Sequence, residues 1–488
     1  FGAHLNASTG FDETIYKMQI PMDKEEIIER AFAIMRDWTT ELLFEGSEIE
    51  RERKVGLEEY RSGLGVQTRI RKKLLPYIFY KSHYHKRLPI GTEESLLNFN
   101  HEALQRFYKT WYRSDLMGVI VVGDVDVLEM EKRIHQVFSD IPSPSDIEEF
   151  QLPTFEVPVH EESFFKVIED EEMPYCRINI LEKFAEEVTT TVGDMRSNII
   201  RDFAMMILNE RLQLIAQAPN APFLAASSGI QSLSLSTGGY QLSCVVGLDK
   251  IQVGLFCIVQ NMLQMKKHGV QNGELDRAKK RFISRLDTIY KERNTTDSKR
   301  LLRELIAHFT VGEAIPGIEY EHDICSEIVK TISCQDILDF LQSWMIGHSQ
   351  VIYLLSGTEN AQSQHSIPSP EELESMYQSA LSQDILELEI EEKVGELLDN
   401  KPERGAIIKE EYLEDLDMYS WTLSNGSIIW LKKTDFQADK IYFAGLGFGG
   451  SSSFDLEKLF SVRVATEVSS LSGLGNLSLP ELQRTLAG

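Results

Sequence analysis

The sequence predicts an α+β protein made of repeated blocks, each a sheet backed by helices. Short apolar runs that are typical of buried strands alternate with longer amphipathic segments that are typical of helices. The tetrapeptide Ile-Pro-Ser-Pro occurs at 141–144 and again at 367–370, each time after an apolar, strand-like run. Acidic stretches follow both copies and indicate domain boundaries.

A chain of 488 residues is usually divided into several domains, each with its own hydrophobic core. The predicted units are a first domain (1–145), a linker (146–165), a second, homologous domain (166–365), an acidic linker (366–408) and the start of a third homologous domain (409–488). The sequence begins at Phe1 inside a strand-like run and ends just after an apparent helix. We therefore expect it to be a piece of a longer protein, with its first and third domains incomplete.

The first domain is expected to open with a hairpin, because residues 3–8 and 14–20 are strand-like on either side of a turn. Amphipathic periodicity predicts helices at 24–45, 47–62, 65–79, 101–112 and 127–138. Residues 117–123, MGVIVVG, are continuously apolar and predict a buried strand.

The second domain repeats this mixture of elements. Strands are predicted at 177–181, 230–246 and 351–357, and helices at 192–216, 251–268 and 273–292. The third domain is expected to begin with strands at 421–434 and 439–450. Its glycines at 445, 447 and 450 formally satisfy GxGxxG, but they do not open a helix inside a βαβ unit, so nucleotide binding is disfavoured.

Composition excludes several classes of protein. A formal net charge of −26 argues against a nucleic-acid partner, because phosphates repel such a surface. The five cysteines are odd in number and form no CxxC pair, which argues against a disulfide framework and a cysteine-based zinc site. No apolar run in this piece is long enough to span a membrane.

The predicted helix at 47–62 carries two glutamates whose surroundings differ from those of its other acidic residues. At about 100° per residue, Glu52 and Glu59 fall on the apolar side with Ile49 and Val55. They are seven residues apart and therefore lie on one stripe, two turns apart. Neither has a basic residue three or four positions away, whereas the neighbouring glutamates do.

A carboxylate that faces an apolar surface needs a distant positive charge, a metal ion or a proton. Periodicity alone leaves two interpretations open. The face could be only partly buried, or neutralised by a distant arginine or lysine as in many structural ion pairs. Alternatively, Glu52 and Glu59 could serve a metal ion whose nitrogen ligands come from elsewhere.

The histidines of this sequence do not supply a recognisable zinc motif. Neither HExxH nor HxxEH occurs. His83 and His85 are two residues apart, a spacing that suits one metal ion only on a strand, and their basic neighbours favour a solvated loop. His308 lies in a mostly apolar helical segment and is expected to pack in the core.

Several separate segments closely resemble the insulinase/pitrilysin family of zinc peptidases, above all its long bacterial members, which join two homologous halves in one chain. They are GAHLNASTGFDETIY (2–16), IERERKVGLEE (49–59), RLPIGTEE (87–94) and FYKTWYRSDLMGVIVVGDVD (107–126). More weakly, 170–357 resemble the family's second domain and 421–450 the first strands of its third. The resemblance implies a mitochondrial-processing-peptidase-like metallohydrolase fold with mainly antiparallel sheets.

In that family, two histidines of an HxxEH motif and a glutamate from a later helix bind Zn²⁺, and the motif glutamate is the general base. By resemblance, Glu59 matches the later zinc ligand, and Glu52 matches the carboxylate that supports a ligand histidine. HxxEH would lie shortly before residue 1 and is absent. This piece alone is therefore expected to lack two zinc ligands and the general base, and to be inactive by itself.

The resemblance also implies where a substrate binds. Leu5, Asn6 and Ala7 match the family's edge strand, which pairs with the backbone of a peptide. Asn6 would orient the scissile carbonyl, and the small Ala7 would let the peptide approach. Without the resemblance, an ordinary edge strand is the alternative interpretation of these residues.

The function implied is that of a zinc metalloendopeptidase that hydrolyses peptides or unfolded polypeptides in an enclosed chamber. The long bacterial members suggest a periplasmic or cell-envelope location, and a homo-oligomer is compatible with the family. The alternative is a non-catalytic relative, which would bind peptides or act as a scaffold without hydrolysing them.

Overall fold

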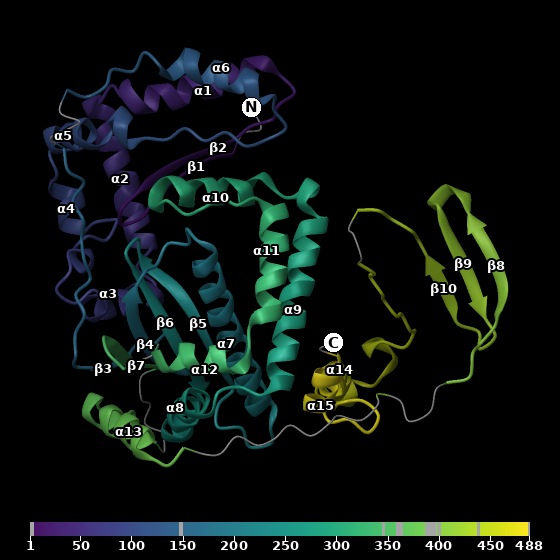
Figure 1. Ribbon diagram of the computed structural model, residues 1–488. Helices are drawn as coiled ribbons and strands as arrows, with labels where there is room; N and C mark the ends of the chain where they lie inside the picture. The colour runs from purple at the N-terminus through teal and green to yellow at the C-terminus, as the bar shows by residue number, and fades with distance from the viewer. Residues whose placement is uncertain are drawn as a thin grey trace.

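The computed structural model describes residues 4–145, 150–343, 347–357, 365–385, 397, 402–436 and 440–486. Its strands form three separate sheets of two, five and three strands. Helices pack on the five-stranded sheet, whereas the three-stranded sheet stands apart from the described helices (Figure 1). Strand pairing is antiparallel in all but one pair. The predicted α+β class, with mainly antiparallel sheets and helices in repeated blocks, is confirmed.

The first block opens with the predicted hairpin. β1 (His4–Thr9) pairs with β2 (Thr14–Gln19), so that Asn6 lies opposite Lys17 and Ala7 opposite Tyr16. All five predicted helices are present, together with one short additional helix. In chain order they are α1 (Glu25–Thr40), α2 (Gly46–Ser62), α3 (Val66–Ile78), α4 (Glu93–Asn98), α5 (His101–Trp111) and α6 (Val127–Phe138).

The predicted buried strand at 117–123 is wrong. The segment is irregular, and Val119 is 36% exposed. Val121 packs against a small cluster around Ile28 and Met130, which joins α1 to α6. An apolar run forms a buried strand only where neighbouring strands take its main-chain hydrogen bonds. Among the described residues of the first block, only β1 and β2 form strands, and they pair with each other.

The second block is built on a five-stranded sheet of order β3-β7-β4-β6-β5, in which only β3 and β7 are parallel. The predicted strand at 230–246 is a hairpin, because the turn at 235–236 divides it into two strands. The strands are β3 (Phe164–Glu169), β4 (Cys176–Ala185), β5 (Ala225–Ser234), β6 (Thr237–Val246) and β7 (Gln350–Ser356). The helices are α7 (Val192–Gln217), α8 (Ile251–His268), α9 (Asn272–Lys291), α10 (Ser298–Val311), α11 (Ile318–Thr331) and α12 (Cys334–Ser343).

The two faces of this sheet are covered by different parts of the chain. Successive side chains of a strand point to opposite faces. Ile178 and Ile180 of β4 accordingly join the main core under the second-block helices. Leu181 faces the other way and packs in a second cluster with Ile70 and Leu74 of α3. Thus α3, which belongs to the predicted first domain, covers a face of the second block's sheet (Figure 1).

The beginning of the predicted acidic linker at 366–408 is a helix instead. In α13 (Pro370–Ser382), Ser369 forms a capping box and Pro370 stands in the first turn, a strong helix-start signal. Leu373 and Tyr377 bury the helix against the main core. Residues 386–396 and 398–401 of this predicted linker lie outside the described residues.

The third block contains a three-stranded antiparallel sheet of order β10-β9-β8. Its elements are β8 (Ile407–Leu413), β9 (Met418–Leu423), β10 (Ile428–Leu431), α14 (Leu459–Leu471) and α15 (Leu479–Leu486). The strand predicted at 421–434 is a hairpin instead, because the turn at 424–425 divides it between β9 and β10. The strand predicted at 439–450 is wrong for its described residues, 440–450, which are irregular and exposed. As at 117–123, no described strand takes up the main-chain hydrogen bonds of these residues.

Candidate metal and peptide site

The helix α2 packs through a stripe different from the one predicted. Ile49 and Leu57 are buried, and the side chain of Arg53 between them is only 12% exposed. Val55, predicted to face inward, is 54% exposed. The stripe follows the i, i+4, i+8 spacing of a helix face, but its centre is an arginine rather than an apolar residue.

Arg53 occupies this central position because its head group finds partners in and just after α4. Its guanidinium donates hydrogen bonds to the Leu96 carbonyl at 2.6 Å and to the Phe99 carbonyl at 2.8 Å. It also lies 3.9 Å from the centroid of the Phe99 ring. Arg53 also donates a hydrogen bond of 3.1 Å to Glu50, and this bond, with a second from His101, lowers the pKa of Glu50 to about 2. Sequence reasoning missed the burial of Arg53 because it considered this residue only as a local partner of Glu50.

The prediction that Glu52 and Glu59 point inward is therefore wrong. Both are exposed, since they lie roughly 100–120° around the helix from Arg53. Glu52 is 65% exposed and its carboxylate reaches only to 4.0 Å from Arg51. Within the described residues, no ion pair or side-chain hydrogen bond engages the Glu59 carboxylate. The prediction that Glu59 lacks a local cation is correct.

The other acidic residues of α2 differ from Glu59 in this respect. Glu58, its neighbour, lies 2.8 Å from Arg61, and Glu48 lies 3.1 Å from Arg51. Such i, i+3 pairs are ordinary helix-surface interactions. Glu59 thus presents an unengaged carboxylate, which is a donor type that zinc accepts.

The described residues do not complete a metal site around it. No group of three or more His, Cys, Asp or Glu side chains lies close enough to hold a metal ion in the described part of the chain. A catalytic zinc ion takes three protein ligands and a water molecule. Glu59 fits one position of such a site, and the remaining ligands are not among the described residues.

The histidines singled out in the sequence have local roles. His83 packs against Phe155 with ring centroids 5.0 Å apart, and Nδ1 of His85 lies 2.6 Å from the Ser82 carbonyl oxygen. The prediction that His308 packs in the core is wrong. It is exposed on α10, with Nδ1 2.7 Å from the Glu313 carbonyl oxygen. A polar partner near the helix end outweighs the apolar composition of that segment.

The residues matched to substrate binding lie on an open sheet edge. All six residues of β1 are exposed, and Leu5 is 59% exposed. The strand pairs with β2 on one side, and no described strand pairs with its other side. Asn6 Oδ1 accepts a hydrogen bond from the Ala7 N–H at 2.9 Å. An edge of this kind can accept an added strand.

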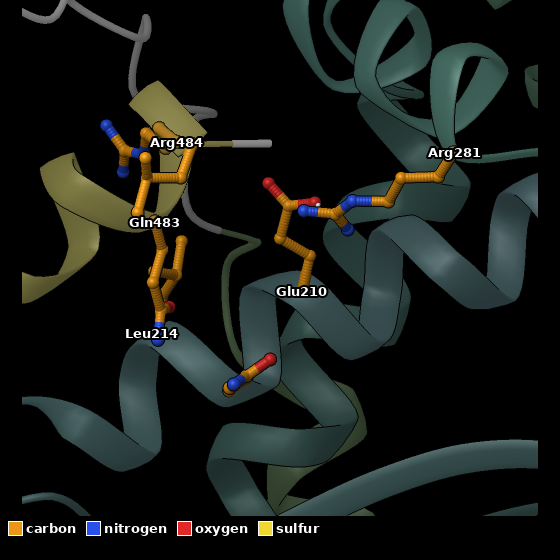
Figure 2. Close-up of a pocket in the computed structure, with 7 residues that line it drawn as sticks. Glu210, Leu214, Arg281, Gln483 and Arg484 are labelled. Carbon is orange, nitrogen blue, oxygen red and sulfur yellow. Dashed lines mark hydrogen bonds and ion pairs between the residues drawn. The ribbon is translucent and has the colours of Figure 1, made fainter. Parts of the chain in front are cut away.

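A cavity of about 320 Å³ lies elsewhere, between α7 and α9 on one side and α15 on the other (Figure 2). At its wall, Glu210 accepts hydrogen bonds of 2.8 Å from both Arg277 and Arg281. Two guanidinium groups therefore neutralise this carboxylate. Because its lining residues all belong to α7, α9 and α15, the cavity is separate from α2 and β1.

The arrangement of the blocks is that of known peptidases. The crystal structure of the periplasmic protease PqqL from Escherichia coli matches with a TM-score of 0.73 at 20% identity, over 98% of this chain and 52% of that one. The crystal structure of pitrilysin matches with a TM-score of 0.56 at 16% identity, over 84% of this chain and 44% of that one. These likenesses establish the fold.

The family follows from the sequence. Residues 1–88 match the model described as insulinase, peptidase family M16, and residues 98–282 match the model described as the peptidase M16 inactive domain. Together the two matches cover more than half of the chain. The chain belongs to the insulinase family of peptidases, M16, as its motifs predict.

Curated relatives extend the match over nearly the whole chain. A "Zinc protease PQQL-like" protein of Arabidopsis thaliana is 27% identical over 97% of this chain and 46% of its own length. A "Probable zinc protease PqqL" of Escherichia coli is 23% identical over 99% of this chain and 52% of its own length. The chain spans about half the length of these relatives.

Proposed function

We propose that this chain is part of a zinc metalloendopeptidase that hydrolyses peptides or unfolded polypeptides in an enclosed chamber. Glu59 is one zinc ligand, and Glu52 supports a histidine ligand. The two histidines and the general base of an HxxEH motif come from residues outside this sequence. The proposal rests on the match of residues 1–88, which include β1 and α2, to the M16 family, and the relatives named zinc proteases support the choice of metal.

The exposure of Glu59 is compatible with this role. A ligand whose partners come from another segment must be accessible to that segment and must not be held by a local cation. The contrast with Glu58, which is paired to Arg61, supports Glu59 as the carboxylate kept available. Bound zinc would activate a water molecule and polarise the scissile carbonyl. The described residues contribute only the carboxylate side of that site.

The open edge of β1 is where we place the substrate. An extended peptide would add as a further strand beside Leu5, Asn6 and Ala7, through main-chain hydrogen bonds that depend little on side chains. The bond between Asn6 Oδ1 and the Ala7 N–H would be exchanged when the peptide pairs there. Asn6 would then be released to orient the scissile carbonyl.

The experiment compares zinc content and peptide hydrolysis in the intact protein and in its Glu59→Gln variant. Loss of about one equivalent of zinc and of hydrolysis, with an unchanged unfolding temperature, is the expected result. Glu58→Gln is the matched control, because Glu58 is adjacent and exposed but paired to Arg61. Equal zinc content in wild type and Glu59→Gln removes Glu59 from the ligand set.

One observation favours a second candidate, a non-catalytic peptide-binding or scaffold relative. Glu52 and Glu59 stand at the surface with no metal-ligating cluster among the described residues. A protein of this kind would bind unfolded peptides along β1 and hydrolyse none. Peptide binding by the intact protein without zinc and without turnover would favour it over the peptidase.

The compartment and assembly are also proposals. A periplasmic or cell-envelope location is supported by the E. coli structure, whose protein is called periplasmic. In the described part of the chain, no helix combines the length and apolar character needed to cross a membrane. The strongly negative charge disfavours nucleic acid as a partner. A homo-oligomer is compatible with these features and is testable by light scattering.

A further inference from the structure

The helix that carries Glu59 continues, after a short turn, into α3, and α3 is held by the second block. Arg69 at the start of α3 makes a bidentate ion pair with Asp170, at 2.7 Å from Nε and 2.6 Å from Nη2. The Asp170 side chain is only 7% exposed. Asp170 directly follows β3 and therefore belongs to the second block.

The same guanidinium reaches back to the end of α2. Nη1 of Arg69 donates a hydrogen bond of 3.0 Å to the carbonyl of Leu64, in the turn between α2 and α3. A planar guanidinium donates in several fixed directions at once, so a single side chain can hold two elements in one geometry. Arg69 thus connects the turn that follows Glu59 to Asp170.

A second contact joins the two helices next to Glu59. Nζ of Lys72 in α3 donates a hydrogen bond of 2.8 Å to the Tyr60 hydroxyl and lies 4.5 Å from the centroid of its ring. Tyr60 is the residue after Glu59. The last turn of α2 and the turn that follows it are therefore each attached to α3 by a hydrogen bond.

The body of α3 is fixed to the sheet of the second block. Ile70 and Leu74 pack with Leu181 and Tyr353, all of them buried. At the far end, Nζ of Lys183 in β4 donates a hydrogen bond of 2.9 Å to the Ile78 carbonyl, the last residue of α3. A ligand that must be held to within about 0.5 Å needs such support from rigid neighbours.

We propose that Asp170 of the second block is a positioning residue for Glu59, acting through Arg69 and the Leu64 carbonyl. This inference rests on the proposed role of Glu59 as a zinc ligand. Under this proposal the second block supports the metal site without supplying a ligand to it. If Asp170 loses its charge, the anionic partner that remains for Arg69 among the described residues is Glu172, at 3.0 Å, whose side chain is 58% exposed. The guanidinium can then move away from the Leu64 carbonyl.

The test is Asp170→Asn in the intact protein, with zinc affinity and amide hydrogen exchange as readouts. We expect zinc to bind about tenfold more weakly and the amides of residues 59–66 to exchange severalfold faster. The matched control is Asp336→Asn, because Asp336 accepts a 2.7 Å bond from Arg196 inside the second block and does not touch α2 or α3. The control should lose comparable thermal stability without either effect.

Two further variants keep the outcomes distinct. Arg69→Lys retains the charge, but an ammonium group cannot bind the Asp170 carboxylate and the Leu64 carbonyl at the same time. This variant should therefore weaken zinc binding severalfold, and it serves as the test if Asp170→Asn does not fold. If zinc affinity and amide exchange in Asp170→Asn and Arg69→Lys change no more than in Asp336→Asn, the positioning role is overturned. In that case, loss of zinc in Glu59→Gln would still support the proposed function. A wild-type protein that binds no zinc overturns both.

Discussion

The guanidinium of Arg53 lies 3.9 Å from the centroid of the Phe99 ring and donates a 2.8 Å hydrogen bond to the carbonyl of the same residue. This side chain lies between the buried Ile49 and Leu57 on one stripe of α2 and bonds that stripe to carbonyls in and just after α4. That stripe faces α4, and Glu52 and Glu59 lie at the surface. The exposure of the two glutamates is therefore a consequence of the burial of Ile49, Arg53 and Leu57 on another face of the helix.

Replacing Arg53 tests this relationship. Arg53→Met keeps much of the aliphatic stem but leaves the Leu96 and Phe99 carbonyls without their donor. We expect a loss of about 2–3 kcal/mol in the free energy of unfolding, measured by denaturant titration. Arg51→Met is the control, because Arg51 is 69% exposed and should cost less than about 0.5 kcal/mol. Equal losses in the two variants would show that Arg53 does not hold α2 against α4.

The main core contains a buried ion pair, and removing one partner is expected to destabilise the fold strongly. Arg211 of α7 and Glu274 of α9 meet at 2.6 and 2.7 Å, with side chains 10% and 7% exposed. Glu274→Gln retains the shape but leaves the guanidinium charge without its counter-charge. We expect a loss of about 3–5 kcal/mol, read from the shift in the denaturation midpoint.

A more exposed pair, between α11 and the segment after α9, provides the comparison for Glu274. Glu319 is 66% exposed and lies 3.0 Å from Arg293. Glu319→Gln should cost at most about 1 kcal/mol, because water screens the pair. A Glu274→Gln variant as stable as Glu319→Gln would contradict the assignment of Arg211–Glu274 as a buried pair.

Lys183 gives the fold a predictable pH dependence. Burial lowers the pKa of Lys183 from 10.5 to about 8. Between these values the unfolded chain binds more protons than the folded one, so the contribution of Lys183 to stability rises with pH from about 8 to 10.5. Below pH 8 the charged group imposes its full cost on the fold. The rise should be of order 2–3 kcal/mol at most.

The measurement compares wild type with Lys183→Met in urea titrations at pH 7 to 10.5. Relative to the variant, the wild type should gain stability as the pH increases. Lys330→Met, which removes a lysine that is 67% exposed, controls for the change in net charge. A constant difference between wild type and Lys183→Met over this range would mean that Lys183 titrates as it does in the unfolded chain.

Local patterns predicted those parts of the fold that local forces determine. The limits of α6 and α8 agree with the sequence prediction, because helix hydrogen bonds close within the segment itself. The runs at 117–123 and 440–450 have strand composition, but a strand is completed by a neighbour that no window of sequence contains. The orientation of α2 was missed for a related reason, since Arg53 is buried by carbonyls of Leu96 and Phe99 more than forty residues away. Periodicity singled out Glu52 and Glu59, whereas their roles, and the choice of the β1 residues, came from the family resemblance. All these roles stay predictions.

The open edge of β1 leads to the last prediction, which rests on the proposed peptidase function. Asn6 is exposed, and its amide oxygen holds only the Ala7 N–H. In the intact protein, Asn6→Ala should leave the free energy of unfolding within about 0.5 kcal/mol of wild type. It should lower kcat/KM for a fluorogenic peptide by about tenfold or more, with most of the loss in kcat, because Asn6 orients the scissile carbonyl. Lys17→Ala is the matched control, since Lys17 lies directly opposite Asn6 on β2 and shares its face of the hairpin. If Lys17→Ala and Asn6→Ala reduce turnover equally, the effect belongs to the hairpin as a whole, and Asn6 has no particular role toward the substrate.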